Sequence, residues 1–191
     1  MKVLPGILTL VISMGTLSGC APKRTMLLPD DTLAWSEHLS LAQTCQARGE
    51  RALAMQHYQL AAGRNSECST AWLALGEFAF EAGDLKTAEA DYRKALKIMP
   101  KNPVAINNLA RVYLAQGKDL NGIDIMVEDA LENAGPLAPY LWHTLARINL
   151  REGRFADARF ALDHALSKAP PDPVFQKRLE ESRQKIAALL P

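Results

Sequence analysis

The sequence has almost no excess of charge of either sign: 22 Lys and Arg against 21 Asp and Glu leave +1 at pH 7 over 191 residues. No basic run interleaved with aromatic residues is present, although nucleic-acid-binding proteins typically carry one. This balance argues against a nucleic-acid partner and against bulk electrostatic attraction as the basis of the function. The chain is long enough to form a core of ordinary size, and 48% of its residues are hydrophobic.

Sequence motifs that carry chemistry are also missing. The chain contains no nucleophile elbow, no phosphate-binding loop and no paired-cysteine motif. None of its histidines is spaced as a metal ligand, for example as a pair at i and i+4, and we interpret each as a helix-surface or groove residue: His38, His57, His143 and His164. We therefore predict no catalytic residue, metal site, cofactor or small-molecule substrate. An enzyme with an unrecognised site is the alternative.

One long hydrophobic run is present, and it lies at the N-terminus. Met1 and Lys2 form a short positive segment, and residues 3–16 are almost wholly apolar. A transmembrane helix needs about 20 apolar residues. Because this run is shorter and ends in small residues, it predicts a signal peptide over residues 1–19.

The residues at the end of this segment, Leu17-Ser18-Gly19-Cys20, resemble the bacterial lipobox, in which the cysteine accepts a lipid. The resemblance implies a diacylglyceryl thioether on Cys20, cleavage before it, and acylation of the new amino group with a fatty acid such as palmitate. Several acyl chains anchor a protein firmly. Ala21 in place of Asp would direct an enterobacterial lipoprotein to the outer membrane. We therefore expect a periplasm-facing outer-membrane lipoprotein with a tether over residues 20–34, and a secretory signal with an incidental cysteine as the alternative.

Two further cysteines, Cys45 and Cys68, leave two alternatives open. The periplasm oxidises thiols, so an even pair favours a disulfide. However, Cys45 falls within a predicted first helix and Cys68 in the loop after the paired helix, and a Cα separation beyond about 7 Å would prevent the bond. The pair is therefore either a disulfide or two buried, independent thiols.

The rest of the chain repeats one pattern. Apolar residues recur at helical spacing on two segments of residues 69–102, with Gly83-Asp84 between them, which predicts a helix–turn–helix hairpin. The positions that resemble the tetratricopeptide repeat are Trp72, Leu75, Gly76, Ala88, Tyr92, Ala95 and Pro100. The turn glycines recur at separations of 34, 34 and 36 residues, against a family period of about 34: Gly49, Gly83, Gly117 and Gly153. Because one hairpin buries too little apolar surface to fold alone, neighbours are required.

We therefore predict an all-α fold, a right-handed α-solenoid of tetratricopeptide hairpins. The expected repeats span residues 35–68, 69–102, 103–138 and 139–172, followed by a C-terminal capping helix over 173–190. After Gly117 the third repeat slips by one residue, so that Ile123 and Val127 take the small and aromatic positions. This is either a bend that reshapes the groove or a tolerated insertion. For the last helix, binding a partner is the alternative to capping.

The resemblance also implies a partner-binding groove, because in this family the first helices line the concave side and four positions of each repeat point inward. The residues expected there are Leu39, Gln43, Leu73, Glu77, Phe80, Asn107, Arg111, Leu114, Tyr140, His143, Arg147 and Leu150. The apolar members offer a seat for a peptide, and the arginines, with Arg151 at the rim, can pair with carboxylates. A solvated face that binds nothing is the alternative.

The chain consists of a lipobox, a short tether and a few repeats. In this overall plan it resembles the assembly lipoproteins of Tad/Flp pili and the pilotins of type IV pili. This implies a non-enzymatic scaffold that binds an envelope protein, such as a secretin or another pilus or secretion component. An adaptor for peptidoglycan hydrolases or synthases is the alternative. The Lys/Asn/Arg clamp of chaperone-binding repeat proteins is not present, because only Asn108 matches it.

Overall fold

The computed structural model describes residues 32–189, so the predicted signal peptide and Cys20 lie outside the described residues. Within that range the secondary structure is entirely helical, without strands. The elements are α1 (Trp35–Ala47), α2 (Arg51–Arg64), α3 (Ser69–Glu81), α4 (Leu85–Ile98), α5 (Pro103–Gln116), α6 (Ile123–Leu131), the 3₁₀ helix η1 (Gly135–Leu137), α7 (Ala138–Arg151), α8 (Phe155–Ser167) and α9 (Pro173–Ala187). None of these helices is sufficiently long and apolar to cross a membrane.

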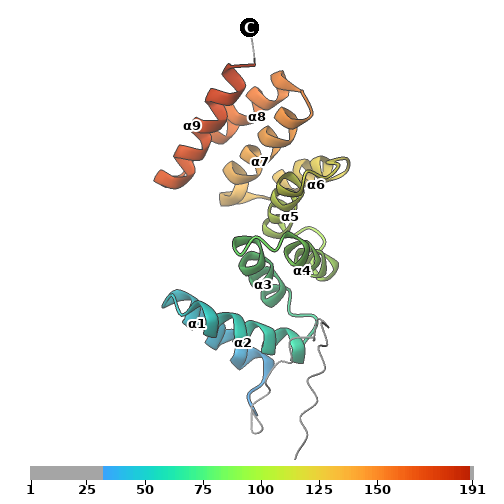
Figure 1. The fold of residues 1–191 in the computed structure, drawn as a ribbon, viewed down its shortest axis with the longest axis vertical. Helices are drawn as coiled ribbons and strands as arrows, with labels where there is room; N and C mark the ends of the chain where they lie inside the picture. The colour runs from blue at the N-terminus through green and yellow to red at the C-terminus, as the bar shows by residue number, and fades with distance from the viewer. Residues whose placement is uncertain (1–31, 190–191) are drawn as a thin grey trace, which may run out of the picture. The chain divides into compact units, whose positions relative to one another are not determined.

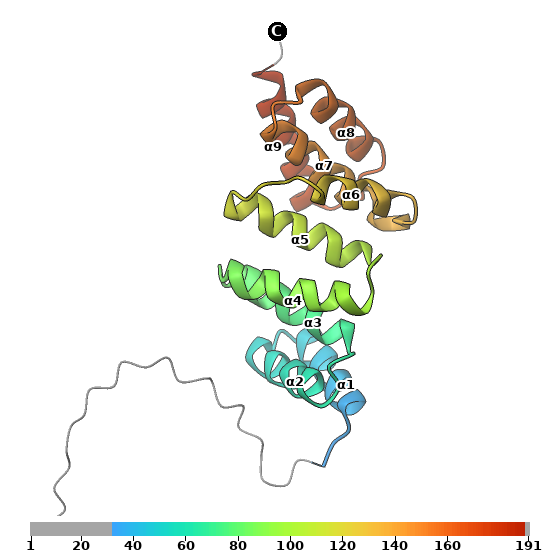
Figure 2. The same cartoon turned by 90° about the vertical axis from the view of Figure 1, so that its right-hand side faces the viewer.

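Successive helices pack in pairs, α1 with α2, α3 with α4, α5 with α6, and α7 with α8, and α9 packs against the last pair. The pairs follow one another in chain order (Figures 1 and 2). The buried faces of α4 to α9 form one continuous apolar core, and a second core joins α1, α2 and α3, with Trp72 packed against both. This confirms the prediction of an all-α solenoid of stacked hairpins.

A glycine in the left-handed region ends the first helix of every hairpin. The φ angles of Gly49, Gly83, Gly117 and Gly153 lie between 72° and 78°. The amide after each glycine donates to the carbonyl five residues earlier, over 2.9 to 3.2 Å. This is the Schellman arrangement, in which a residue without a Cβ takes a positive φ and satisfies carbonyls at the helix end. The repeated glycine is therefore a requirement of the repeated turn.

The third hairpin departs from the others in its second helix. The helices α2, α4 and α8 begin two residues after the turn glycine, whereas α6 begins at Ile123 after a longer loop, with Gly122 at φ 85° before it. As a result α6 has 9 residues, against 14, 14 and 13 in its counterparts. Ile123 and Val127 are nevertheless buried, at 3% and 0% exposure. The hairpin keeps its core side chains but has a shortened second helix.

Small residues allow the paired helices to approach closely. Ala88 and Ala95 of α4 are fully buried on either side of the buried Tyr92. The ring of Tyr92 packs on the backbone of α3 at Gly76, where an added Cβ would lie 2.7 Å from the ring atom Cε1. Such a distance is shorter than any ordinary van der Waals contact, so glycine and tyrosine form a matched pair across the hairpin.

Cys45 and Cys68 are both buried and both free thiols. Cys45 lies within α1 and Cys68 precedes α3, and each packs into the core that these helices share with α2. Burial is the main cause that raises the pKa of the Cys45 thiol, and its hydrogen bond with Glu50 raises the pKa further. The structure therefore favours two independent thiols over the disulfide.

We expect Gly76→Ala to destabilise the protein by about 1–3 kcal/mol, because the new methyl group overlaps the Tyr92 ring. Gly63 provides a matched control: it also lies within a helix, and an added Cβ there meets nothing within 4 Å. Gly63→Ala should raise the free energy of unfolding by about 0.5–1 kcal/mol through helix propensity. Urea denaturation of both variants measures the two changes in the free energy of unfolding. Equal changes would contradict the close packing of Tyr92 on Gly76.

Candidate protein-binding surface

The first helices of the last three hairpins, α3, α5 and α7, line one hollow together with α9, and we call their side that faces it the first-helix surface. This hollow of about 200 Å³, the cationic pocket, lies between α3, α5, α7 and α9. Its lining combines aromatic rings with three guanidinium groups: Phe80, Asn107, Arg111, Tyr140, His143, Thr144, Arg147, Phe175 and Arg178.

The structure places the residues predicted for the groove in three groups. Six of them line the cationic pocket: Phe80, Asn107, Arg111, Tyr140, His143 and Arg147. Leu114 and Leu150 line an adjoining hollow of about 250 Å³, together with Arg147 and Arg151. The others lie toward the N-terminus, where Leu39 and Leu73 are half-buried, Gln43 is exposed, and Glu77 is bound to neighbouring side chains.

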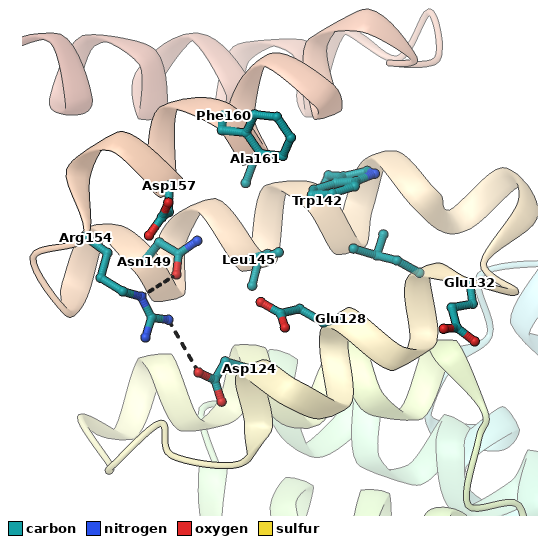
Figure 3. A pocket seen from close by; sticks show the side chains of 11 residues that line it. Asp124, Glu128, Glu132, Trp142, Leu145, Asn149, Arg154, Asp157, Phe160 and Ala161 are labelled. Atoms are coloured by element: carbon teal, nitrogen blue, oxygen red, sulfur yellow. Dashed lines mark hydrogen bonds and ion pairs between the residues drawn. The ribbon is translucent and has the colours of Figure 1, made fainter.

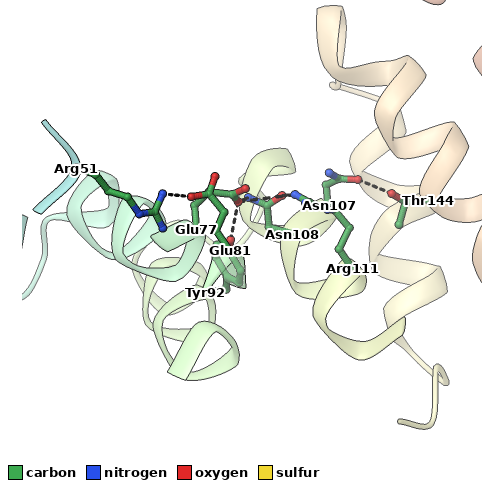
Figure 4. A network of polar contacts seen from close by, with 8 residues as sticks. All are labelled: Arg51, Glu77, Glu81, Tyr92, Asn107, Asn108, Arg111 and Thr144. Atoms are coloured by element: carbon green, nitrogen blue, oxygen red, sulfur yellow. Dashed lines mark hydrogen bonds and ion pairs between the residues drawn. The ribbon is translucent and has the colours of Figure 1, made fainter. Parts of the chain in front are cut away.

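Glu77 holds three helices together. Its carboxylate accepts hydrogen bonds from the Tyr92 hydroxyl of α4, at 2.8 Å, and from the Asn108 amide of α5, at 3.1 Å. Arg111 lies 3.7 Å from the same carboxylate and donates to the Asn108 side-chain oxygen over 2.9 Å (Figure 4). Burial raises the pKa of Tyr92, and the charge of Glu77 adds to this effect. Glu77 is therefore occupied within the fold rather than open to a partner.

Two more polar contacts extend this network along the first-helix surface. Thr144 of α7 donates its hydroxyl proton to the Asn107 side-chain oxygen of α5, at 2.7 Å (Figure 4). At the other end, Arg51 of α2 pairs with the Glu81 carboxylate and donates to the Phe78 carbonyl of α3, at 3.2 Å. Each contact crosses a hairpin boundary, so the network connects successive hairpins.

Helix α9 supplies one wall of the cationic pocket, which the sequence did not reveal. The Phe175 ring packs at a tilt against Tyr140, with 4.3 Å between centroids, and meets His143 edge-on at 5.6 Å. The Ser182 hydroxyl lies 2.9 Å from Nε2 of His143. Since the α9 residues Phe175 and Leu179 are also buried, at 3% and 0% exposure, capping of the last hairpin is favoured over a free partner-binding helix.

The interpretation of all histidines as surface or groove residues is wrong for His38. This side chain is only 1% exposed, because it lies on the face of α1 that packs against α2, and its ring meets His57 with 3.0 Å between the Nδ1 atoms. His143 lines the pocket as predicted for a groove residue, but at 7% exposure it lies at the bottom, beneath α9.

Arg147 is the central cation of the site, because it lines the cationic pocket and both adjoining hollows. The Arg147 side chain is exposed to solvent, but the surrounding helices remove part of its hydration. This partial burial lowers the pKa of Arg147, and the positive charges of Arg111 and Arg178 lower it further. Within residues 32–189, the guanidinium groups of Arg147 and Arg178 make no hydrogen bond or ion pair.

This arrangement can bind anions but offers no evident covalent chemistry. A guanidinium group binds a carboxylate through two parallel hydrogen bonds, and the Tyr140 and Phe80 rings supply apolar contact beside it. Arg111 itself lies over the Phe80 ring, 4.5 Å from the centroid. Among the described residues, no group of three His, Cys, Asp or Glu side chains could hold a metal ion.

Comparison with known proteins identifies the repeat. A tetratricopeptide repeat family model matches residues 79–119, from the end of α3 through the turn after α5. A curated relative, cellulose synthase operon protein C of Pseudomonas fluorescens (strain SBW25), is 37% identical over 86 residues. That match covers 44% of this chain and 7% of the relative, so the chain spans only a small part of its length.

Two solved structures are similar in fold. Pseudomonas aeruginosa pilF matches with a TM-score of 0.61 and 20% identity, over 83% of this chain and 74% of its own. MamA (41-end) from Desulfovibrio magneticus RS-1 matches with a TM-score of 0.61 and 15% identity, over 81% of this chain and 92% of its own. At these identities the likeness concerns the fold. The fold is an α-solenoid of tetratricopeptide hairpins, which is typically a non-enzymatic scaffold for protein–protein interaction.

We expect the buried His143 side chain to make the protein less stable in acid. Burial, with Arg147 and Arg178 nearby, lowers the pKa of His143 from 6.5 to about 4. Between these values the unfolded chain binds a proton that the folded chain does not, so stability falls as the pH is lowered through this window, by up to about 3 kcal/mol. Urea denaturation from pH 7 to 4 should show a shallower loss for His143→Gln, and parallel profiles would contradict the assignment.

Proposed function

We propose that the protein is a scaffold of the bacterial outer membrane that faces the periplasm, anchored through a lipid on Cys20. In this proposal its cationic pocket binds an acidic segment of a protein partner, and the complex helps to assemble a pilus or secretion machine. The observation that carries the binding part is the presence of two guanidinium groups, on Arg147 and Arg178, that share one aromatic-lined hollow and have no acceptor among the described residues.

The electrostatics of the pocket favour an anionic partner. Partial burial is the main cause of the lowered pKa of Arg147, and the nearby positive charges of Arg111 and Arg178 lower it further, so the charged guanidinium is destabilised where it stands. A partner carboxylate would relieve this repulsion and gain charge-assisted hydrogen bonds. Lys185, on the rim of the adjoining hollows, adds a further positive charge. Glu181 is the single carboxylate that lines any of these three hollows.

The size of the pocket favours a peptide over a small molecule. The cationic pocket has about 200 Å³ and the two adjoining hollows about 250 Å³ each, whereas small-molecule sites usually enclose about 300–1,000 Å³. Shallow hollows in a row suit successive side chains of an extended or helical segment. Leu114 and Leu150, beside Arg147, would contact its apolar residues.

The envelope part of the proposal is supported by the plan of the chain. The residues before Cys20 resemble a lipobox, and the segment after it resembles a tether that leads to the repeats. The likeness in fold to Pseudomonas aeruginosa pilF supports a role in pilus assembly. A secretin or another pilus or secretion component is the partner that we propose.

To test the binding site, we propose reversing the charge of Arg147 and Arg178 in the full chain and recovering partners from crosslinked detergent extracts. The double variant Arg147→Glu, Arg178→Glu should lose about tenfold or more of the partner, because it places like charges against the partner's acidic residues. Arg111 is left unchanged, since it pairs with Glu77 and Asn108 within the fold.

The matched control reverses two lysines that line none of the three hollows, Lys168→Glu and Lys177→Glu; Lys177 is on the same helix as Arg178. This control should retain the partner. Equal recovery of the partner with both double variants would place the interface elsewhere. Recovery of cell-wall enzymes in place of pilus or secretion components would overturn the proposed role in assembling a pilus or secretion machine.

The anchor is tested separately. Mass spectrometry of the mature N-terminus should find Cys20 carrying a diacylglyceryl group and an acylated amino group, and the protein should fractionate with membranes. Cys20→Ala should abolish both, whereas Cys45→Ala, at the buried cysteine of α1, should leave both unchanged. An unmodified thiol at residue 20 of the mature chain would refute the lipid anchor.

A further inference from the structure

A second hollow lies on a different part of the repeat stack and has the opposite charge. It measures about 700 Å³ and lies between α6, α7 and α8 (Figure 3). We call it the acidic pocket, and its lining is distinct from that of the cationic pocket: Asp124, Glu128, Leu131, Glu132, Trp142, Leu145, Asn149, Arg154, Asp157, Phe160 and Ala161.

The acidic pocket exists because one face of α6 is unsuited to close packing. Asp124, Glu128 and Leu131 recur at helical spacing on α6, Glu132 follows directly after the helix, and all four line the hollow. In Figure 3 the Glu128 side chain lies between α6 and Leu145 of α7. A helix face that meets its neighbours is normally an apolar stripe, but three of these four residues are carboxylates. Carboxylates that entered a dry interface would lose their hydration without compensation. The shortened helix therefore leaves a water-accessible gap against α7 and α8.

The opposite wall of the acidic pocket is aromatic and apolar. Trp142 and Phe160 meet edge-on with 6.1 Å between ring centroids, and His164 stacks against Trp142 at 4.6 Å. Leu145 and Ala161 complete this wall. Phe160 is 60% exposed, although it is one of the largest apolar side chains of the hairpin. A cluster of rings that lies open to solvent beside a hollow marks a surface suited to binding.

The carboxylates of the acidic pocket are only partly neutralised from within. Arg154 reaches Asp124 over 3.4 Å, but it also pairs with Glu152, at 2.5 Å, and donates to Asn149, at 2.8 Å. In the part of the chain that the structure describes, Glu128, Glu132 and Asp157 have no ion pair or side-chain hydrogen bond. The pocket therefore presents an uncompensated negative rim around an aromatic wall.

We propose that the acidic pocket is a second docking site, which binds a basic amphipathic segment of a partner protein. The lysine or arginine side chains of the segment would reach Glu128, Glu132 and Asp157. Its aliphatic side chains would pack on Trp142 and Phe160, whose ring faces also attract cations. Charge complementarity selects this partner, since an acidic segment would meet repulsion here and attraction at the cationic pocket. The inference does not depend on the function proposed above.

The test uses the full chain in a non-ionic detergent and a short fluorescein-labelled peptide that alternates lysine with leucine. Fluorescence anisotropy should detect binding that weakens about tenfold in the variant Glu128→Gln, Glu132→Gln. Asp129→Asn, which removes a neighbouring exposed carboxylate of α6 outside the pocket, should bind like the parent. Because the detergent is the same in every sample, differences between variants report on the protein.

The aromatic wall is tested with its own matched pair. Phe160→Ala should weaken the peptide several-fold, whereas Ile125→Ala, which removes an equally exposed apolar side chain (59%) outside the pocket, should not. A peptide with glutamate in place of lysine should not bind at this site. The inference is overturned if Asp129→Asn weakens the lysine peptide as much as the paired glutamine variant, if no variant differs from the parent, or if Phe160→Ala weakens the glutamate peptide as much as it weakens the lysine peptide.

Discussion

Close approach of paired helices is the constraint on which the rest of this structure depends. In the second hairpin α3 presents the small Gly76 to the large Tyr92 of α4, and this pairing lets the two helices bury their facing sides. The fully buried alanines Ala88 and Ala158 serve the same need in their hairpins. Since the hairpins stack in series, these contacts set the orientation of each first helix, and hence the spacing of the side chains that a partner would meet.

Polar residues on the first-helix surface divide into two groups by their surroundings. Glu77, Asn107 and Asn108 contact other side chains across helix boundaries, so they belong to the fold as much as to the surface. Arg147 and Arg178 lack such acceptors among the described residues and stand in a hollow that repels additional positive charge. A family position that points inward is therefore not by itself a binding residue, because its neighbours determine whether the group is already satisfied.

Much of the fold follows from local rules that act identically in each repeat. The turn glycines predicted the hairpins because the Schellman turn requires a positive φ. The features that could not be predicted from the sequence depend on packing between segments that are distant along the chain. The burial of His143 beneath α9 and the aromatic wall formed by Trp142 and Phe160 each require knowing which faces meet, whereas the slip before α6 is already visible in the sequence. No periodic pattern reports such a meeting, since the residues involved lie on different helices.

The double role of α9 restricts how this repeat array can grow. Tandem arrays ordinarily lengthen by duplicating a hairpin, and a terminal helix can then move outward to close the new end. Here Phe175 and Arg178 of α9 complete the cationic pocket together with α7. If a hairpin were inserted after α8, its first helix would take the place of α9 beside α7. Arg178 would then be separated from Arg147. Lengthening at this end would therefore dismantle the pocket unless the inserted helix supplied equivalent residues.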